Sequence, residues 1–452
     1  TETNMAGKIK HYVKSALRQA KADPLFTAIY IAGVTLAIAT TLTMAMLYYI
    51  KIADIYPEVN RDKTYYLNRI SIKTKSFTMN GSASIYFLDE YVKPIEGVID
   101  AGVYYDSYDD ASVQISEDRG DIPAKVKLVD NGFFDVVCFN FLQGEPFTRE
   151  DIDGEVKDVI ITDELAELVF GKGETDFVGK MISIDFQDYR VKGVVESASP
   201  LTNVSFSQIY MPAAVKSTSA FYVRDGANSS EWQKINGSYK CILLIDAGNV
   251  DAVNERLQEQ IKIIERKSNS GSDGEVTLEF IPLQSHAMSV VAGSDNYEVE
   301  TWWEALKGNI VVILVVLLVP AMNLGGLITG RMDARVGELG VRKAFGASRG
   351  SIYGQVLSEN LVYTFIGGAI GLLASVIIVI TGRMALMKMI DSSLNTILVE
   401  SASVTYRPEM FLSWTVFGVA IVVCVVLNVA SAMIPAWVSM HRPIVESLNE
   451  KR

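Results

Sequence analysis

Four long apolar stretches alternate with polar segments along the chain, and each is long enough to form a membrane-spanning helix. They comprise residues 25–50, 309–330, 359–382 and 410–434. About 20 apolar residues suffice to cross the hydrocarbon core of a bilayer, and a charge near the centre of a span is costly. No charged residue lies inside these stretches, apart from Glu359 at the edge of the third. The pattern therefore predicts a membrane protein with four transmembrane α-helices.

The segment before the first span, residues 5–24, is basic and amphipathic, with Ile9, Val13 and Leu17 on one helical face. This predicts a helix that lies on the inner membrane surface; the solvated start of the first span is the alternative. The first span is too long for the core of a signal peptide, and no small-residue cleavage site follows it. We therefore expect it to remain in the protein.

The polar segment between the first two spans, residues 51–308, is long enough for one or two folded domains. Its pattern predicts a unit with the order strand, helix, strand near each end. The first unit comprises residues 63–74, 84–98 and 102–105, and the second comprises residues 239–246, 250–267 and 275–282. The second helix has an apolar stripe, as in a helix that covers a core. The stripe residues are Val253, Leu257, Ile261 and Ile264.

A strand-rich stretch, residues 106–237, lies between these two units. Its expected strands are 124–130, 158–162, 181–186 and 189–195. The polar pair Gln187–Asp188 predicts a hairpin turn between the last two. We therefore expect an α+β domain in which residues 63–105 and 238–283 form one subdomain and residues 106–237 are inserted into it.

Basic residues cluster in three segments next to the spans, which predicts the orientation of the chain. Lysine and arginine are enriched in segments on the cytoplasmic side of a membrane. The residues concerned are Lys8, Lys10, Lys14, Arg18, Lys21, Arg331, Arg335, Arg342, Lys343, Arg349, Arg442, Lys451 and Arg452. Residues 331–358 and 435–452 are therefore expected inside, together with the N-terminus, and residues 51–308 and 383–409 outside. The large outer segment has 43 acidic and 25 basic residues, a net charge of −18, which suits a water-exposed domain.

The nearest approach to a phosphate-binding loop is the stretch Gly173–Met181. A P-loop has four residues between its glycines and a hydroxyl group after its lysine. Here five residues separate Gly173 from Gly179, and Met181 follows Lys180. A turn that leads into a strand is the better interpretation, and no cofactor is expected in this chain.

Other patterns typical of catalytic or metal sites are missing from the sequence. The three histidines, His11, His286 and His441, are scattered and form no zinc-binding motif. The acidic pairs Asp109–Asp110 and Glu117–Asp118 are expected on a solvated surface rather than in a pair of catalytic carboxylates. We therefore expect no catalytic residue and no metal ligand, and no enzymatic activity of the chain itself.

The three cysteines are too few for a disulfide framework. Cys138 and Cys241 both fall in the outer segment, where they form either one disulfide or two buried free thiols. Cys424 falls in the fourth span, where we expect it to pack.

The most informative segment is the inner loop between the second and third spans, residues 331–358. Glu338 and Arg342 are four residues apart, which is a favourable spacing for an ion pair on a helix. Gly346 is suited to end that helix, and Ser348 to cap the next one. The loop therefore predicts a short charged helix that can dock on a cytoplasmic partner; an ordinary connecting loop is the alternative.

The same loop resembles the signature of MacB/FtsX-type ABC transporter permeases. The run ARVGELGVRKAFGASRGSI carries this resemblance, and ENLVYTFIGGAIGLL is similar to the third span of the family. Three outer runs are similar to the family's periplasmic core domain: FFDVVCFNFLQGEPF (133–147), ITDELAELVFGKGETDFVGKMISI (161–184) and YRVKGVVESAS (189–199). The tail PAWVSMHRPIVESL is similar to the final element of the family. The resemblance covers essentially the whole chain.

The resemblance implies a bacterial inner-membrane permease whose inner loop is a coupling helix, seated on a cytoplasmic ATPase that binds ATP and Mg²⁺. By matching positions, the docking residues are Glu338, Gly340, Arg342, Lys343, Ala344 and Gly346. It also implies a dimer with a second copy or a paralogue, and a porter-like outer subdomain with an inserted sabre-like one. Because the first span begins at residue 25, we expect the ATPase to be a separate subunit.

The expected function is to transmit ATP-driven motion to the periplasmic domain for the export of a peptide, drug, toxin or lipid-linked substrate. A periplasmic adaptor and an outer-membrane channel are further expected partners, and no nucleic acid is expected. A lipoprotein-releasing permease of the Lol type and an FtsX-like relay that activates cell-wall hydrolases are the alternatives. A membrane-bound enzyme is least favoured, because no catalytic cluster is found.

The spans favour a relay of motion over a tunnel, because they contain no charges to line a polar path. Glycines in the second and third spans permit close approach between helices; ordinary tight packing of a membrane bundle is the alternative. These glycines are Gly325, Gly326, Gly367, Gly368 and Gly371.

Overall fold

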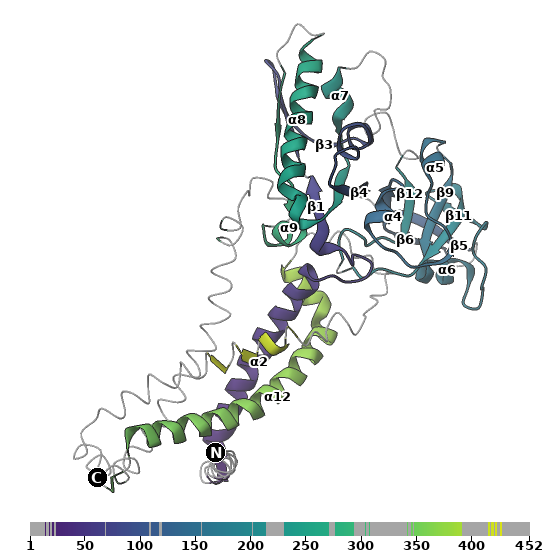
Figure 1. The fold of residues 1–452 in the computed structure, drawn as a ribbon. Helices are drawn as coiled ribbons and strands as arrows, with labels where there is room; N and C mark the ends of the chain where they lie inside the picture. The colour runs from purple at the N-terminus through teal and green to yellow at the C-terminus, as the bar shows by residue number, and fades with distance from the viewer. Residues whose placement is uncertain are drawn as a thin grey trace. The chain divides into compact units, whose positions relative to one another are not determined.

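The computed structural model describes two parts of the chain nearly continuously, together with a few isolated residues elsewhere (Figure 1). The described ranges are 24–67, 69–107, 110–116, 120–154, 156–200, 202–213, 230–270, 276–292, 345–346 and 348–390. The chain divides into two compact units. The first unit comprises Thr1–Tyr49, Asn309–Ile390 and Pro408–Arg452, and the second comprises Ile50–Gly308 and Asp391–Arg407.

Two long apolar helices lie among the described residues, α2 (Pro24–Ile52) and α12 (Arg349–Ile390). Their segments Thr27–Ile52 and Asn360–Gly382 are long and apolar enough to cross a membrane. They correspond to the first and third predicted spans. The second predicted span and most of the fourth lie outside the described residues.

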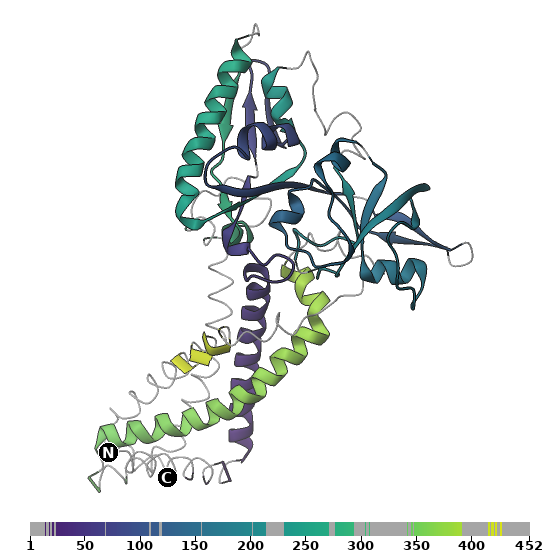
Figure 2. The same ribbon diagram turned by 45° about the vertical axis from the view of Figure 1, so that its right-hand side comes forward.

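α2 and α12 pack closely against each other where α12 contains glycines (Figure 2). A Cβ atom at Gly367 would lie 2.8 Å from Cγ1 of Val34, and a Cβ atom at Gly371 would lie 2.9 Å from the backbone oxygen of Thr35. Both distances are shorter than van der Waals contact, so a side chain at either position would push the helices apart. Thr35 Oγ1 also donates a hydrogen bond to Gly367 O (3.2 Å). The close approach predicted for Gly367 and Gly371 is confirmed.

Each of the two helices has a buried face and an exposed face. Tyr30 and Tyr363 are buried against each other, with ring centroids 5.8 Å apart. In contrast, Leu36, Phe365 and Leu373 are each more than 60% exposed. Large apolar side chains exposed in this way are typical of a surface that faces lipid.

The second unit is built around a mixed sheet of twelve strands. Eleven of them follow the order β16-β1-β14-β4-β7-β12-β9-β11-β10-β5-β6, and β8 pairs with β11. The strands are β1 (Thr64–Leu67), β4 (Val98–Asp106), β5 (Ala111–Ser116), β6 (Gly120–Ala124), β7 (Val126–Val129), β8 (Phe141–Gly144), β9 (Asp158–Thr162), β10 (Met181–Ile184), β11 (Gln187–Val195), β12 (Ile209–Pro212), β14 (Lys240–Ile245) and β16 (Gln284–Ser285). The pairs β7–β12 and β9–β11 are parallel and the other pairs are antiparallel.

The antiparallel pair β4–β7 joins the strands of the two bracketing units to those of the middle stretch. Tyr104 on β4 is in register with Val129 on β7. Hydrogen bonding therefore continues from one part of the second unit to the other. Short helices surround the strands: η1 (Arg61–Lys63), α3 (Ile85–Phe87), η2 (Leu88–Val92), α4 (Phe133–Val136), α5 (Arg149–Asp153), α6 (Asp163–Phe170), α7 (Glu231–Ile235), η3 (Ala247–Asn249) and α9 (His286–Ala292).

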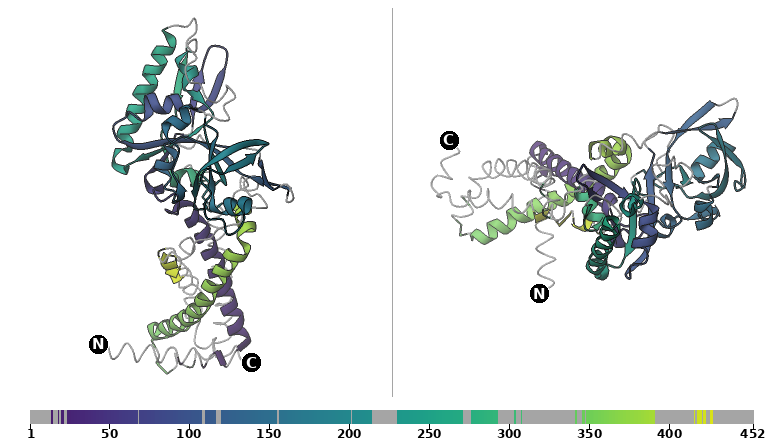
Figure 3. Two further views of the ribbon diagram at one scale, coloured as in Figure 1. Left: turned by 90° about the vertical axis from the view of Figure 1, so that its right-hand side faces the viewer. Right: turned by 90° about the horizontal axis from the view of Figure 1, so that it is seen from above.

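A smaller sheet with the order β13-β3-β2-β15 is covered by the long helix α8 (Val250–Asn269) (Figure 3). Its strands are β13 (Asn236–Gly237), β3 (Thr78–Ala83), β2 (Ile70–Lys73) and β15 (Thr277–Phe280). The predicted apolar stripe of α8 is confirmed. Val253, Leu257, Ile261 and Ile264 are all buried.

Two local predictions are corrected. The strand expected over residues 63–74 is two strands, since β1 belongs to the large sheet and β2 to the small one. The helical stretch expected over residues 84–98 is limited to α3 and the π-helical turn η2, which ends just before Lys93-Pro94. Lys93 still has helical backbone angles, but Pro94 has no amide hydrogen to continue the helical hydrogen bonds, so the helix stops there.

The predicted hairpin between β10 and β11 exists, but its turn lies at Asp185–Phe186 rather than at Gln187–Asp188. Both turn residues have positive φ, 51° and 61°, as a two-residue hairpin turn requires. The turn is fastened to Ser112 on β5: Asp185 N donates to Ser112 O, and Ser112 N donates to Asp185 Oδ1, both at 2.8 Å. The prediction from the polar pair Gln187–Asp188 therefore placed the turn two residues too late.

Asp130 holds α4 against β4 from a fully buried position. Its Oδ1 accepts hydrogen bonds from the backbone amides of Val103 (2.9 Å) and Phe133 (3.0 Å). Burial raises the pKa of Asp130 to about 6, although Lys93 and the two amide donors act in the opposite direction. Folding therefore makes this carboxyl group harder to ionise.

Candidate functional site

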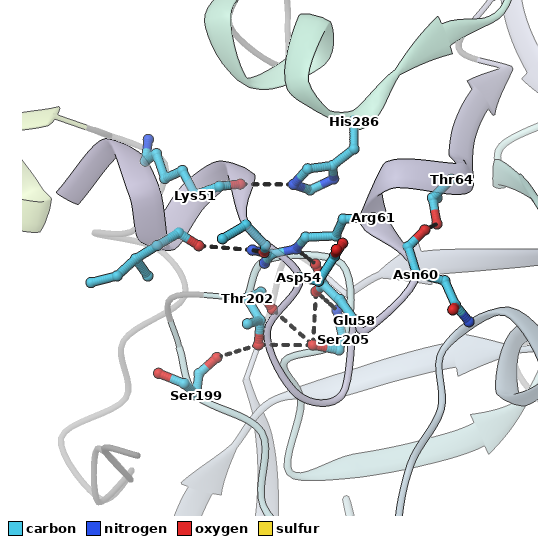
Figure 4. A network of polar contacts seen from close by, with 12 residues as sticks. Lys51, Asp54, Glu58, Asn60, Arg61, Thr64, Ser199, Thr202, Ser205 and His286 are labelled. Carbon is cyan, nitrogen blue, oxygen red and sulfur yellow. Dashed lines mark hydrogen bonds and ion pairs between the residues drawn. The ribbon is translucent and has the colours of Figure 1, made fainter. Parts of the chain in front are cut away.

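The second unit contains a group of buried polar side chains around the C-terminal end of α2 (Figure 4). We call it the α2-end network; its side chains are Glu58, Arg61, Thr202, Ser205 and His286. The network joins segments that are far apart in the sequence: the residues that follow α2, the loop before β12 and the start of α9. All of these residues, including the last ones of α2 from Ile50 onward, belong to the second unit.

Arg61 binds the carbonyl groups at which α2 ends. Its Nη1 donates hydrogen bonds to Ile50 O (2.7 Å) and to Ala53 O (2.6 Å). The last carbonyls of a helix have no partner within the helix, and a positive charge there interacts favourably with the helix dipole. Arg61, which begins η1, therefore caps α2 from outside the helix.

Glu58 connects Arg61 to the loop that precedes β12. Its Oε2 accepts a hydrogen bond from Arg61 Nε (2.7 Å), and its Oε1 accepts from both the amide and the hydroxyl of Ser205 (2.8 Å each). Burial acts to raise the pKa of Glu58, but Arg61, His286 and the Ser205 hydroxyl together hold it below its ordinary value. Glu58 is therefore a charged carboxylate with both oxygens engaged.

The loop before β12 continues these contacts into the sheet. Thr202 Oγ1 lies 2.8 Å from Ser205 Oγ and donates a hydrogen bond to Ser199 O (2.7 Å). Tyr210, which is on β12, donates from its hydroxyl to Ser205 O (2.6 Å). Ser205 thus links Glu58 to strand β12 by hydrogen bonds on both sides.

His286 holds the end of α2 from the other side. Its Nε2 lies 2.7 Å from Lys51 O, and its Nδ1 lies 2.7 Å from the hydroxyl of Tyr66 on β1. A carbonyl oxygen can only accept, so Nε2 carries the hydrogen and Tyr66 donates to Nδ1. Burial, followed by the charge of Arg61, lowers the pKa of His286 to about 4, against the opposing effect of Glu58. The imidazole is therefore neutral at neutral pH.

The α2-end network is suited to fix positions rather than to carry out chemistry. Glu58, Arg61 and His286 are buried, and each is hydrogen-bonded to protein groups on at least two sides. The sequence did not reveal this site. Glu58 and Arg61 follow a membrane span, where charged residues are normally solvated. The scattered histidines indicated neither a metal site nor a catalytic group, so no role was predicted for His286.

Most of the docking residues predicted in the inner loop, namely Glu338, Gly340, Arg342, Lys343 and Ala344, lie outside the described residues. Gly346 is described and has φ +85°, the left-handed conformation in which glycine ends a helix. Phe345 N donates to Val341 O (3.1 Å), as in the last turn of a helix, and α12 begins directly after Ser348. The predicted helix stop is confirmed, and the docking role of the loop stays a prediction.

Other sequence candidates prove to be structural. The stretch Gly173–Met181 is a turn that leads into β10, with Lys180 paired to Glu174 (2.7 Å), which confirms the interpretation as a turn. Asp110 forms an ion pair with Lys125, whereas Asp109 and the pair Glu117–Asp118 lie outside the described residues. Among the residues that the structure describes, no three acidic, histidine or cysteine side chains gather as metal ligands would.

Cys138 and Cys241 are both free thiols, the first exposed and the second buried. Of the two alternatives, the structure therefore supports free thiols, although only Cys241 is buried. Burial raises the pKa of the Cys241 thiol, and partial desolvation by nearby groups raises that of the Cys138 thiol as well, although the residue as a whole is exposed. Cys424 lies outside the described residues.

The described residues thus combine an α+β unit with two helices long and apolar enough to cross a membrane, as in a membrane protein with a large folded domain. Residues 27–260 match the family model of the MacB-like periplasmic core domain, and residues 310–444 match that of the FtsX-like permease C-terminal region. The chain therefore belongs to the MacB/FtsX family of ABC transporter permeases.

Several characterised and uncharacterised relatives are similar in sequence. The uncharacterized ABC transporter permease YknZ of Bacillus subtilis is 23% identical over 300 residues, which cover 65% of this chain and 66% of YknZ. The macrolide export ATP-binding/permease protein MacB of Chromobacterium violaceum is 23% identical over 56% of this chain and 35% of its own length. MacB of Escherichia coli K12 is 21% identical over 58% and 36%. The chain thus spans just under two thirds of YknZ and about a third of the MacB proteins.

Solved structures of outer domains are also similar. The extracellular domain of YknZ covers 47% of this chain at 18% identity and a TM-score of 0.29. The periplasmic region of MacB from Actinobacillus actinomycetemcomitans covers 47% at 15% identity and a TM-score of 0.31.

Proposed function

We propose that this protein is the membrane subunit of an ABC transporter and transmits ATP-driven motion from a cytoplasmic ATPase to its outer unit. One observation carries the proposal: α2, a helix of membrane-spanning length, begins in the first unit and ends on the buried α2-end network of the second. Membership of the ABC permease family supports the ATPase as the source of motion. ATP and Mg²⁺ bind to the ATPase.

In this proposal four transmembrane helices enclose no polar path, and the outer unit contains a porter-like part with an inserted sabre-like part. The permease is an inner-membrane dimer with both termini in the cytoplasm. The ATPase is a separate subunit that docks on residues 331–358, and a periplasmic adaptor and outer-membrane channel complete the exporter. The substrate is a peptide, drug, toxin or lipid-linked molecule that is handled on the outer side. The MacB relatives named as macrolide exporters support export over lipoprotein release or hydrolase activation.

Charge reversal in the inner loop tests the docking of the ATPase. We expect Arg342→Glu with Lys343→Glu to abolish co-purification of an ABC ATPase from membranes and to uncouple ATP hydrolysis from transport, with the protein still folded. The basic pair lies in the predicted docking helix, where reversal leaves like charges opposed to acidic groups of a partner. The matched control is Lys451→Glu with Arg452→Glu, which makes the same charge change in the cytoplasmic tail. If the loop variant retained the ATPase as the tail variant does, the docking role would be wrong.

Labelling of introduced thiols in intact cells tests the orientation. In a background without the natural cysteines, a cysteine in place of Phe345 (88% exposed) should react only with a membrane-permeant maleimide. A cysteine in place of Phe186 (91% exposed) should react with an impermeant one as well. Equal reaction of both positions with the impermeant reagent would place the inner loop on the same side as the outer unit and refute the relay.

A further inference from the structure

Residues 53–60 connect α2 to η1 and strand β1. Bending of this connection would prevent a movement of α2 from reaching the sheet. Eight residues, 53–60, separate the end of α2 from η1, and they contain no helix and no strand longer than a single bridge. Irregular connections of this length normally bend more easily than the elements that they join. A relay that pushed through this connection alone would turn the helix without turning the sheet.

The α2-end network removes this freedom by fastening the two ends of the connection to each other. Arg61, at the far end, donates to Ile50 O and Ala53 O at the near end. Directly after η1, strand β1 begins at Thr64, so the hold of Arg61 passes straight into the large sheet. His286 adds a second hold between Lys51 O and Tyr66 on the same strand.

Glu58 extends this hold to a different part of the sheet. It lies inside the connection, yet it binds Ser205, whose carbonyl accepts from Tyr210 on β12. β1 and β12 are separated by three other strands in the sheet order, so the two contacts are far enough apart to resist rotation. A single contact would act as a pivot, whereas two separated contacts set an orientation.

The burial of the Glu58–Arg61 pair distinguishes it from a second arginine–glutamate pair, Arg256–Glu96, among the described residues of this unit. Arg61 and Glu58 are 2% and 5% exposed, whereas Arg256 and Glu96, at the same N–O distance of 2.7 Å, are 41% and 87% exposed. Charged hydrogen bonds are short and directional, and a pair shielded from water holds one geometry better than a solvated pair does. The buried pair is therefore suited to fix an angle.

We propose that Glu58 and Arg61 are positioning residues that lock the 53–60 connection, so that α2, β1 and β12 turn as one body when the membrane helices move. This inference rests on the proposed function, because it assigns the residues through which the proposed movement reaches the outer unit. In this proposal the Glu58–Arg61 pair is a rigid joint, meaning that it prevents bending of residues 53–60, and the second unit follows the movement of α2.

Pulsed EPR on the full chain in lipid nanodiscs tests the rigidity without nucleotide or partner. Spin labels on Leu36→Cys in α2 and Gln258→Cys in α8, in a background without natural cysteines, report the distance across the joint. We expect a single narrow distribution in the otherwise unchanged protein and in the control Arg256→Met. In Arg61→Met and Glu58→Gln we expect the narrow peak to be lost. A second label pair, Gln258→Cys with Thr277→Cys, lies entirely around the small sheet and should not change in any variant.

A peak as narrow in Arg61→Met and Glu58→Gln as in the control would overturn the joint. If Arg61→Met also broadened the Gln258–Thr277 pair, that variant would be locally unfolded and Glu58→Gln, which keeps the shape of the side chain, would decide. In that case a narrow Leu36–Gln258 peak in Glu58→Gln refutes the proposal, and a broad one supports it.

Nucleotide separates this inference from the proposed function. In the complex with its co-purified ATPase, a non-hydrolysable ATP analogue should shift both a Leu36–Leu373 pair in the first unit and a Gln258–Gln258 pair between two copies. In Arg61→Met, we expect the first shift to persist and the second to be lost. If both shifts persisted, the joint would be refuted while the transporter proposal stood. If the unchanged protein showed neither shift, the proposed function would fail, and the assignment of a driven joint with it.

Discussion

His286 is a buried side chain whose proton uptake would oppose folding. Its neutral form donates to Lys51 O and accepts from Tyr66, and Arg61 lies close by as a positive charge. A proton on Nδ1 would remove the acceptor for Tyr66 and place two positive charges together. The hydrogen bond to Lys51 O survives protonation, so the opposition comes from the Tyr66 contact, from Arg61 and from burial.

We predict that His286→Gln makes the protein less sensitive to acid. In the unfolded chain the imidazole binds a proton below its ordinary pKa of 6.5, whereas in the folded protein it does so only below about 4. Between these values the unfolded state binds more protons, so the free energy of unfolding falls as the pH falls, by about 3 kcal/mol at most. Glutamine keeps one donor and one acceptor without this titration. Urea unfolding of the purified chain from pH 7 to pH 4 measures the change in slope.

Asp130→Asn provides a control with the opposite sign. The pKa of Asp130 is raised to about 6 in the folded protein, so the folded state binds more protons than the unfolded state between pH 6 and the ordinary value of 3.8. This carboxyl group therefore gains stability on acidification, and its removal should make the acid loss steeper. Equal slopes in both variants and in the unchanged protein would show that neither group governs the pH dependence.

At the scale of single residues, the sequence predicted the glycines and missed the buried charges. Gly367 and Gly371 were recognisable because small residues in an apolar span have few other uses. Glu58, Arg61 and His286 gave no comparable signal, because their burial depends on contacts with residues more than a hundred positions away, such as Ser205. Spacing along the chain cannot show that a charge will be surrounded by three distant segments.

At the scale of elements, the contact between α2 and α12 depends on backbone approach. We predict that Gly371→Leu lowers the free energy of unfolding by about 2 kcal/mol or more, since its Cβ atom would meet the backbone oxygen of Thr35 and a backbone cannot move aside as a side chain can. Thermal unfolding of the full chain in detergent measures the effect.

Gly354→Leu is the matched control on the same helix. Among the described residues, no atom outside the helix's own backbone lies within 4 Å of a Cβ at Gly354. Leucine also favours helix over glycine, so this variant should be neutral or slightly more stable. The idea of a close helix contact would be abandoned if both variants unfolded at the same temperature.

The β10–β11 hairpin carries an unfavourable residue at its turn. Phe186 has φ +61° and is 91% exposed, so it gains little packing to offset a conformation that L-residues avoid. We predict that Phe186→Gly stabilises the protein by about 1 kcal/mol, because the turn then reads Asp-Gly. Urea unfolding measures the gain. Gln187→Gly, one residue further and inside β11, should destabilise instead; a loss in both variants would indicate that Phe186 is favourable where it stands.

Elements with a strong pattern of apolar residues could be predicted from the sequence. Boundaries that depend on which strands pair with each other could not. The stripe of α8 and the strand β9 (Asp158–Thr162) were found from periodicity and an apolar run, and both are confirmed. The break between β1 and β2 was missed, because both strands are apolar and only their different partners, β14 and β3, separate them. The position of the β10–β11 turn was missed because it depends on the anchor to Ser112.

For the whole second unit, the sheets and their cores should be independent of the membrane. We predict that an isolated fragment of residues 53–303 is soluble and unfolds cooperatively, since it contains all described strands and an excess of acidic residues. Analytical ultracentrifugation and urea unfolding check this. Aggregation of the fragment would mean that the membrane helices are needed for its fold.

A shorter fragment of residues 64–285 keeps every described strand but lacks Glu58, Arg61 and His286. We expect it to be less stable than the 53–303 fragment by roughly 3 kcal/mol or more, because Ser205 and Tyr66 lose their buried partners. Equal urea midpoints for the two fragments would show that the α2-end network contributes nothing to the stability of the sheet.

The length of α12 has a mechanical consequence. At about 1.5 Å per residue, its 42 residues measure roughly 60 Å along the axis of this curved helix (Figure 2), about twice the thickness of the hydrocarbon core. Gly371, where α12 touches the backbone of α2, lies close to the midpoint, so the helix extends about 30 Å on either side of this fulcrum. A tilt of about 10° around it displaces each tip by roughly 5 Å in opposite directions. In the proposed relay, a push on one tip of α12 would therefore displace the other tip by a similar distance in the opposite direction.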